Sequence, residues 1–443
     1  MGITEKLRVL ARSGGFKRFF VLRLLCQSGD GMFQAALATL FFFSAESQGS
    51  PGAIALALFA MLAPFTFVGP FVGVFVDRWP RRNIVVFTDS TRLALTVIII
   101  AIILTWGITP AVYVLAMLAL ALNRFLLAAL GAALPRVVES EQLLVANSIL
   151  PTIGAAATGI GALVGVVLGL VLPEGNTRDA ATLALAVVVF ASSVAVVLGF
   201  RRDALGPDAG EAQASAKLSV AGVLRELGVA VSRLRELRSP ARALAVMAAM
   251  RLLYGMVFVA SILVARNYFG GANGTGGANG TGGDAAHGLG SFAQIIAATA
   301  VGFALAIVVT PLVAERLGEH RWIQICLVVC AAAMTLITVH LVPITMLIAA
   351  LLLGVGTQGA KIAFDTIIQQ DTPDDFRGRA FVLYDLLFNT AFMLAGLLCA
   401  IFLPVSGVST AMFVVIGVCF VVLTAAYGGR RSLREIVPAG VRS

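Results

Sequence analysis

Several ionisable side chains lie inside long apolar segments of the sequence. A charge at the centre of a lipid bilayer costs about 2.5–3.5 kcal/mol on insertion scales, so each such residue is a candidate functional group. Carboxylates in this setting can carry protons, and basic side chains can neutralise them or bind anions. The residues are Arg23, Asp30, Asp89, Arg92, Arg124, Arg251, Lys361, Asp365 and Asp385.

The composition predicts that a membrane surrounds these residues. The chain has 443 residues, of which 59% are hydrophobic and 12% are charged. Soluble domains have about 45–50% apolar and about 25% charged residues, so we expect an all-α membrane protein. Twelve apolar windows have spanning length, at 19–44, 52–76, 83–106, 110–133, 145–172, 181–200, 241–265, 289–312, 321–341, 343–368, 379–402 and 408–428.

The windows fall into two groups of six. This spacing predicts a cytoplasmic N-terminal segment, a first bundle, a cytoplasmic linker, a second bundle and a cytoplasmic tail. Their ranges are 1–18, 19–200, 201–240, 241–428 and 429–443. The second bundle contains a flexible extracytoplasmic insert, 267–288, in which Gly270–Asp284 reads GGANGTGGANGTGGD, and we interpret it as a tolerated loop expansion.

The net charge of +9 is explained by topology. Basic residues accumulate in cytoplasmic loops, and with both termini inside about 25 of them face the cytoplasm, against Arg178 and Arg266 outside. No basic face on a soluble fold is apparent, so we expect no nucleic-acid partner. The Ala-, Gly- and Val-rich composition favours a bacterial chain, and therefore the bacterial cytoplasmic membrane. Because the basic segment from Met1 to Arg18 has no small-residue cleavage site before the first apolar run, we expect it to be a cytoplasmic leader and not a cleaved signal.

The two halves carry related landmarks. The segment that closes the second window reads GVFVDRWPRR from Gly73 to Arg82, and the eighth window closes with the related Glu315-Arg316. Glu315 follows Asp77 by the same number of residues as Pro373 follows Pro135. Two landmarks in one register indicate a duplicated six-helix unit.

These motifs resemble the major facilitator superfamily of transporters. The resemblance covers essentially the whole chain and rests on the loop pattern, on Arg124 ahead of Gly131 and on the glycine-rich fifth segment. It implies two pseudo-symmetric six-helix bundles. The stretches from Leu134 to Asn147 and from Gln369 to Arg379 are similar to the branch of bacterial drug and siderophore exporters, although no Gly-Pro motif appears in the fifth segment.

The resemblance implies that the loop motif is a cytoplasmic gate. Gly73 would allow close helix packing, and Asp77 would pair with Arg81 or with the N-terminal end of the eleventh segment. The alternative is a helix stop with arginines that set topology. Pro80 stands where the family prefers glycine. The proposed gate residues are Gly73, Asp77, Arg78, Arg81, Arg82, Glu315, Arg316 and Asp385, and Asp385 could instead face the bundle.

In this superfamily segments 1, 4, 7 and 10 line the central cavity. In the register of the duplication Lys361 aligns beside Arg124, and Arg251 aligns beside Asp30 once the insert is allowed for. We therefore expect Asp30, Arg124, Arg251 and Lys361 to form a cavity quartet near the repeat axis. Arg23 lies two helical turns from Asp30 and would line the cytoplasmic vestibule.

Asp30 is our first candidate for a proton-carrying acid, because the protonation of a carboxylate in a water-poor cavity responds to the charges around it. The alternative is a static partner for Arg124 or Arg23. Asp365 could carry the proton instead, or it could neutralise Lys361 four residues earlier on the same helix. We expect Asp89 and Arg92 to have a structural role, linking their helix to neighbouring helices. Gly161, Gly165 and Gly169 predict a close helix contact.

The expected function is secondary active transport by alternating access, with proton-coupled efflux of a hydrophobic or amphipathic small molecule. The alternatives are a lysophospholipid or other lipid transporter of the same fold, and a non-transporting scaffold, sensor or membrane enzyme. The sequence has no P-loop and no cluster of catalytic or metal-binding residues, and the five cysteines lie in apolar runs. We therefore expect no enzyme, no cofactor and no metal. The expected partners are a small-molecule substrate, protons and the lipid bilayer, with the chain a monomer.

Overall fold

The structure is a computed structural model that places helices on all twelve predicted segments. It describes residues 13–43, 50–72, 76, 79–138, 143–173, 175–201, 204–206, 220–269 and 285–429. The first six spans contain α2 (Gly14–Ala38), α3 (Pro51–Phe67), α5 (Arg81–Trp106), α6 (Pro110–Val137), α7 (Leu143–Val171) and α8 (Asn176–Leu198). The last six contain α11 (Arg238–Leu263), α12 (Ala285–Leu317), α13 (Glu319–Val339), α14 (Pro343–Asp371), α15 (Asp374–Phe402) and α16 (Thr410–Gly429).

Proline and glycine mark the helix ends. Pro110 and Pro343 occupy the first turn of α6 and α14, where the missing N–H has no intrahelical partner to lose. Gly107 follows α5 and Gly318 precedes α13 with φ of 73° and 82°, values that L side chains rarely adopt. The helix boundaries predicted from the apolar windows therefore coincide with local stop signals.

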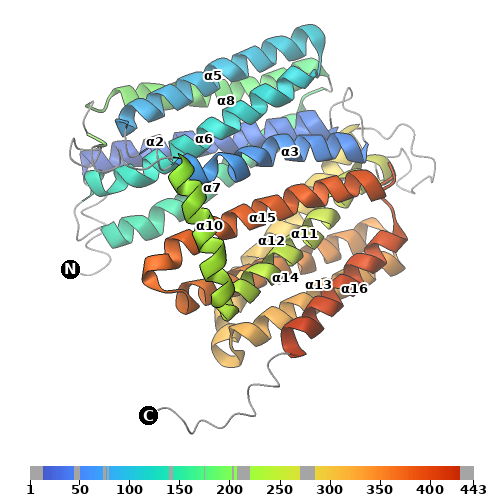
Figure 1. The fold of residues 1–443 in the computed structure, drawn as a ribbon. Coiled ribbons are helices and arrows are strands. Elements are labelled where there is room, and N and C mark those ends of the chain that lie inside the picture. The colour runs from blue at the N-terminus through green and yellow to red at the C-terminus, as the bar shows by residue number, and fades with distance from the viewer. Residues whose placement is uncertain are drawn as a thin grey trace, which may run out of the picture. The chain divides into compact units, whose positions relative to one another are not determined.

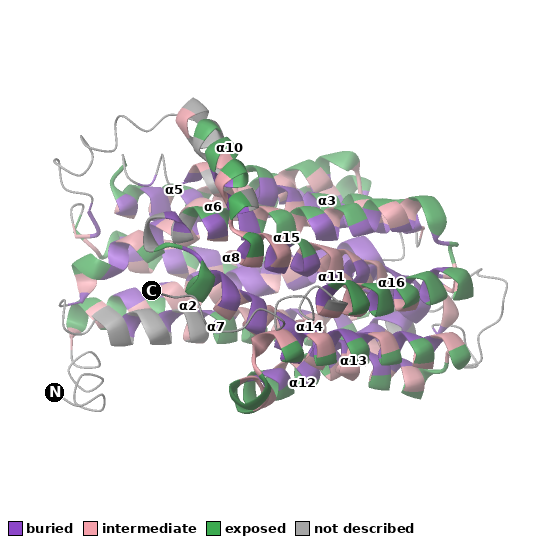
Figure 2. Cartoon of the chain, turned by 60° about the horizontal axis from the view of Figure 1, so that its bottom comes forward, coloured by how far each residue is buried: buried purple, intermediate pink, exposed green. Residues whose placement is uncertain are grey.

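Ten of these helices are long and apolar enough to cross a membrane. The two exceptions are α2, which carries polar residues such as Arg23 and Asp30 within its apolar run, and the shorter α3. Large apolar side chains such as Phe87 and Leu163 are exposed along the helices, and exposed residues run along several helices in Figure 2. Such faces fit a lipid environment, and the described helices make an all-α membrane protein.

The chain divides into two compact units. The first comprises residues 1–48 and 57–225, and the second comprises residues 49–56 and 226–443. The boundary at Arg225 lies within α10 (Val220–Glu236), the helix of the predicted linker. Within the second unit Ala230 and Leu234 of this helix are buried, and Arg233 stacks on Phe376 with its Cζ 5.4 Å from the ring centre.

The same helix pairs recur in the two units. In the first unit α2 packs on α7 and α8, and α5 packs on α6 and α8. In the second unit α11 packs on α15 and α16, and α13 packs on α14 and α16. The paired helices are the first, third, fourth, fifth and sixth spans of each half, and their labels can be followed in Figure 1. The matched pairing agrees with the duplication inferred from Asp77-Arg78 and Glu315-Arg316.

Candidate functional site

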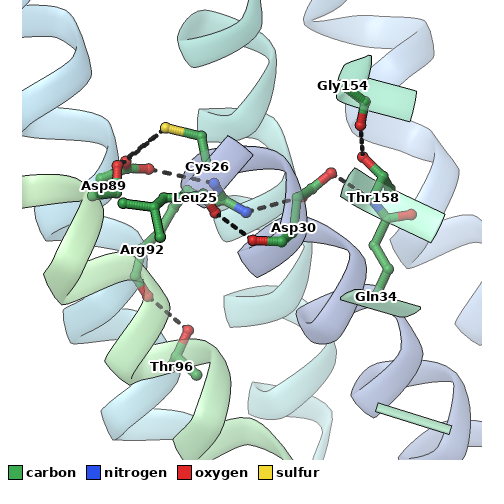
Figure 3. Close-up of polar contacts among 11 residues, drawn as sticks. Leu25, Cys26, Asp30, Gln34, Asp89, Arg92, Thr96, Gly154 and Thr158 are labelled. Atoms are coloured by element: carbon green, nitrogen blue, oxygen red, sulfur yellow. Dashed lines mark hydrogen bonds and ion pairs between the residues drawn. The ribbon is translucent and has the colours of Figure 1, made fainter. Parts of the chain in front are cut away.

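A buried charge cluster joins α2 to α5 in the first unit. Asp89 and Arg92 lie one turn apart on α5, so both side chains point to the same side of that helix. The Arg92 guanidinium donates from Nη2 to Asp30 Oδ1 at 2.9 Å and from Nη1 to Asp89 Oδ1 at 3.4 Å. Figure 3 shows the arginine between the two carboxylates. We call Asp30, Asp89 and Arg92 the α2–α5 charge cluster.

Further donors surround its two carboxylates. The Ser193 hydroxyl on α8 donates to Asp89 Oδ2, and the Cys26 thiol donates to the same oxygen at 3.4 Å. On α2, Gln34 Nε2 donates to Asp30 Oδ2 at 2.7 Å. In addition to the arginine, Asp89 thus has two neutral donors and Asp30 has Gln34. Because Cys26, Asp30 and Gln34 are spaced four residues apart, one face of α2 supplies all three groups.

The members of the cluster differ in exposure. The side chains of Arg92 and Asp89 are 0% exposed, whereas the Asp30 side chain is 8% exposed. Arg92 also stacks on Phe190, with its Cζ 4.3 Å from the ring centre. Asp30 is therefore the one member of the cluster whose side chain keeps some exposure, while the other two side chains are fully enclosed by the packing around them.

Glycines allow the α2 backbone to come close to its neighbours. A Cβ atom at Gly31 would overlap the carbonyl of Thr158 on α7, and one at Gly161 would overlap the carbonyl of Ser28. A Cβ atom at Gly29 would lie 2.8 Å from the Phe190 ring, the ring that covers Arg92. The close contact predicted from the glycines of span 5 is therefore present, and it sets the position of Asp30.

Two predicted arginines lie on the first-unit helices near this cluster. Arg124 and its neighbour Asn123 on α6 interact with the Asp30 carboxylate. Arg23 donates from Nε to Gln27 Oε1 at 3.0 Å, on the helix that carries Asp30. The ion pair that the structure gives Asp30 is with Arg92, which the sequence analysis had assigned only a structural tie.

In the second unit Lys361 and Asp365 pair along α14. The Lys361 Nζ lies 2.8 Å from Asp365 Oδ2, and the two side chains are 37% and 29% exposed. This is the self-neutralising arrangement that the four-residue spacing allowed. Lys361 also faces the Tyr384 ring, with Nζ 5.6 Å from its centre.

Arg251 on α11 has an aromatic environment. Its Cζ lies 3.9 Å from the ring centre of Phe388, 4.1 Å from that of Phe392 and 5.5 Å from that of Tyr254. Among the described residues, no carboxylate lies within ion-pair distance of this guanidinium. The second unit therefore holds an arginine that is stacked and not neutralised by a salt bridge.

Arg251 and Lys361 line one small cavity, which we call the α11–α14 cavity. Its volume is about 40 Å³. Its polar lining consists of Arg251, Tyr254, Thr357, Gln358 and Lys361, and Phe388 is among its apolar residues. The structure thus brings these two predicted cavity residues together, and it brings Asp30 and Arg124 together in the first unit.

The described part of the loop motif binds backbone carbonyls of the first unit. Arg81 donates from Nη1 to the Ala132 carbonyl at 3.1 Å, and its backbone N–H donates to the Gly206 carbonyl at 2.8 Å. Arg82 donates from Nη2 to the Leu198 carbonyl at 3.1 Å. These arginines fasten the start of α5 to the ends of α6 and α8.

The other predicted gate residues are either exposed or outside the described part of the chain. Gly73, Asp77 and Arg78 lie outside the described residues. Glu315 and Arg316 are exposed at the end of α12, and Asp385 is exposed on α15.

Sequence reasoning missed several polar partners. Ser193 was not singled out, and Cys26 was interpreted as a packing residue although its thiol hydrogen-bonds Asp89. Arg178, which we expect on the extracytoplasmic side, is 2% exposed and pairs with Asp179 at 3.3 Å, a partner that the sequence analysis did not name. The four-residue spacing of Cys26 and Asp30 was the available signal, whereas nothing in the sequence ties Ser193 to Asp89. Within the described residues, no group of His, Cys, Asp and Glu could hold a metal ion.

Helix order and buried intramembrane charge define a polytopic membrane protein, and the comparison with known proteins gives its family and shows that it is a transporter. A family model described as Major Facilitator Superfamily matches residues 268–439. Uncharacterized MFS-type transporters of Mycobacterium bovis and Mycobacterium tuberculosis are each 31% identical over 392 residues, which cover 88% of this chain and 86% of the relative. The chain belongs to the major facilitator superfamily, and it is a transporter of that family and not an enzyme.

Solved structures share the fold at low sequence identity. The nucleoside transporter NupG, as a mutant, aligns with a TM-score of 0.67 at 12% identity, over 93% of this chain and 98% of that one. A mutant of the peptide transporter POT in complex with alafosfalin aligns with a TM-score of 0.69 at 15% identity, over 95% of this chain and 94% of that one. These similarities confirm the all-α major facilitator fold expected from the sequence.

Proposed function

We propose that this transporter exports a hydrophobic or amphipathic small molecule in exchange for protons, as a monomer that works by alternating access. Membership of the family supports transport itself. The proposal of export rests on the sequence similarity of Leu134–Asn147 and Gln369–Arg379 to bacterial exporters. The proposal of proton coupling rests on one observation, the Asp30 carboxylate in the α2–α5 charge cluster.

Asp30 has the properties that a proton carrier requires. It combines an 8% exposed side chain with a strong partner, Arg92, that is sealed from water. When a proton neutralises Asp30, Arg92 keeps its bond to Asp89, so the arginine is never left as an isolated buried charge. Protonation can therefore loosen the tie between α2 and α5 without the full cost of an unpaired arginine.

The loop motif is proposed to act as the cytoplasmic gate. Arg81 and Arg82 support this role by fastening the start of α5 to carbonyls of the first unit, so that this end of the loop moves with that unit. We also propose that both termini face the cytoplasm, in a bacterial cytoplasmic membrane, because the basic residues favour this orientation.

Reconstitution tests the proposal. Purified protein in liposomes is offered a panel of amphipathic drugs, siderophores and lysolipids, with and without an imposed pH gradient, while a dye in the lumen reports proton flux. We expect at least one compound to move only with the gradient, accompanied by counterflow of protons. If the movement of no compound in the panel depended on the pH gradient, the antiporter proposal would be contradicted.

Two variants locate the coupling residue. Asp30→Asn should abolish gradient-driven movement while downhill exchange of the same compound continues. Glu319→Gln, in the first turn of α13, changes an acid outside the charge cluster and should behave as wild type. Full gradient-driven transport by Asp30→Asn would show that another group carries the proton.

A lipid substrate is the second candidate, and a groove on the first unit favours it. The groove has a volume of about 410 Å³ and lies between α5 and α6, where Trp79, Phe87, Leu122 and Phe125 line it. Trp79 and Phe87 are more than half exposed. Competition between lysophospholipid and the drugs of the panel for the same gradient-driven transport would favour this candidate.

A further inference from the structure

We propose that the α11–α14 cavity binds the anionic head group of the substrate between Arg251 and Lys361, so that the transported molecule is an organic anion carrying a carboxylate, sulfonate or phosphate. This inference rests on the proposed transport function and adds the chemical class of its substrate. It concerns only the second unit, in which every lining residue lies.

The first argument is the charge balance around Arg251. Arg92 in the first unit has two carboxylates within 3.4 Å, whereas no described carboxylate lies within ion-pair distance of Arg251. An arginine inside a membrane span without an acidic partner is costly, and such residues mark sites where ions or substrates bind. A ligand anion would supply the missing countercharge.

The second argument is the geometry of the aromatic contacts. Phe388 and Phe392 stack on the guanidinium with ring centres 3.9 and 4.1 Å from its Cζ. Stacking uses the faces of the planar group and leaves its in-plane N–H donors for hydrogen bonds. The Nε atom of Arg251 is buried without a hydrogen-bond partner. The aromatic rings therefore hold the arginine in place while its N–H donors remain available, as bidentate recognition of an oxyanion requires.

Lys361 and its neighbours complete the polar lining. The Lys361 ammonium uses one of its three donors on Asp365 at 2.8 Å. Gln358 and Thr357 lie about one turn earlier on α14 and line the same cavity. Two cations thus line the cavity, and the one carboxylate paired with them, Asp365, is not among the lining residues. The neutral donors of the lining suit the oxygens of a head group.

The size of the cavity restricts what enters it. A volume of about 40 Å³ has room for a carboxylate or a similar head group but not for a whole drug-sized molecule. The apolar remainder of the ligand must extend beyond this volume, and the Phe388 ring in the lining offers an apolar contact. The cavity therefore favours a ligand with an anionic head group attached to an apolar body.

Equilibrium binding to the full-length protein in nanodiscs tests this assignment. The probes are 2-naphthoate, 2-naphthalenesulfonate and 2-naphthyl phosphate, with the uncharged 2-naphthamide as the matched neutral compound. We expect at least one anion to bind the wild-type protein about 30-fold or more tightly than the amide, the factor that corresponds to losing one buried charged contact. Equal binding of the amide and all three anions, or no binding of any anion, would overturn the assignment.

Substitutions locate the site. Arg251→Gln should lower the affinity for the anion by about 30-fold and leave the affinity for the amide unchanged, and Arg251→Lys should lose less. The matched control is Arg242→Gln on the same helix, because Arg242 stacks on Tyr427 and donates to the Ala426 carbonyl at 2.9 Å, outside the cavity. Unchanged anion binding by Arg251→Gln would exclude this site, and the comparison of anion with amide in the wild type stands even if that variant does not fold.

The outcomes separate this inference from the proposed function. Equilibrium binding uses no pH gradient, so anion binding through Arg251 can hold while gradient-driven transport fails. Conversely, a transporter that exchanges protons for neutral or cationic drugs, with no preference for the naphthyl anions, would keep the proposed function and overturn the anion site.

Discussion

Arg92 on α5 forms its shortest ion pair with Asp30 on α2, at 2.9 Å, although Asp89 on its own helix lies at 3.4 Å. This ion pair joins α2 to α5. Phe190 of α8 stacks on the Arg92 guanidinium, so α8 packs against the same pair of helices. Because this link between α2 and α5 is made of buried charge, it leads to a prediction about stability.

Replacing Arg92 by methionine should destabilise the protein by about 3–5 kcal/mol, because two buried carboxylates lose their common partner. Arg92→Lys keeps the positive charge, but a lysine has no planar guanidinium with which to bridge the two carboxylates. Its loss of stability should therefore be intermediate. Thermal unfolding of the detergent-solubilised variants measures both. A methionine variant as stable as wild type would mean that the ion pairs contribute little.

Gly161→Leu should prevent close packing of α7 on α2, because a Cβ atom there would overlap the Ser28 carbonyl. Gly159 on the same helix has open space around its Cβ position, so Gly159→Leu is the matched control. We expect the Gly161 variant to lose folded yield and several degrees of melting temperature, as overpacking costs about 1–3 kcal/mol or more. Equal behaviour of the two variants in size-exclusion chromatography and melting would contradict this packing.

Asp365→Asn should cost less than about 1 kcal/mol, because the Lys361–Asp365 pair is 37% and 29% exposed and screened accordingly. We also expect this variant to keep gradient-driven transport, since Asp30 is the proposed proton carrier. If Asp365→Asn lost proton coupling while Asp30→Asn kept it, Asp365 and not Asp30 would be the proton carrier.

The native cysteines should differ in reactivity. Cys26, Cys326, Cys330 and Cys399 are buried, whereas Cys419 is partly exposed. A maleimide added to the folded protein in detergent should label Cys419 first and the buried thiols only after denaturation, as intact-mass spectrometry would show. Early labelling of Cys26 would contradict its burial against Asp89 and Ser193.

The orientation can be tested at the two ends of α14. In a chain without native cysteines, His340→Cys before this helix and Gln370→Cys near its end provide exposed thiols on opposite sides. A membrane-impermeant maleimide added to intact cells should label the first and not the second, if both termini are cytoplasmic. The reverse pattern would invert the topology.

Twelve helices, their pairing into two related halves and the family were predictable from the sequence. Apolar runs of spanning length have few alternatives in a bilayer, because every backbone polar group must be satisfied within the segment. Proline and glycine at positions such as Pro110, Pro343 and Gly318 then place the ends. The register shared by Asp77-Arg78 and Glu315-Arg316 indicated the repeat before any helix was placed.

The partners of the buried charges were decided only by the tertiary structure. Sequence reasoning offered Arg124 or Arg23 as the partner of Asp30. Arg124 does lie near the carboxylate, but the rotation of α5 against α2 makes Arg92 its ion-pair partner. Hydrophobic periodicity says which residues lie within the membrane, and it does not say which faces of two helices meet. That choice depends on close packing at Gly31 and Gly161 and on Phe190, contacts between residues far apart in the chain.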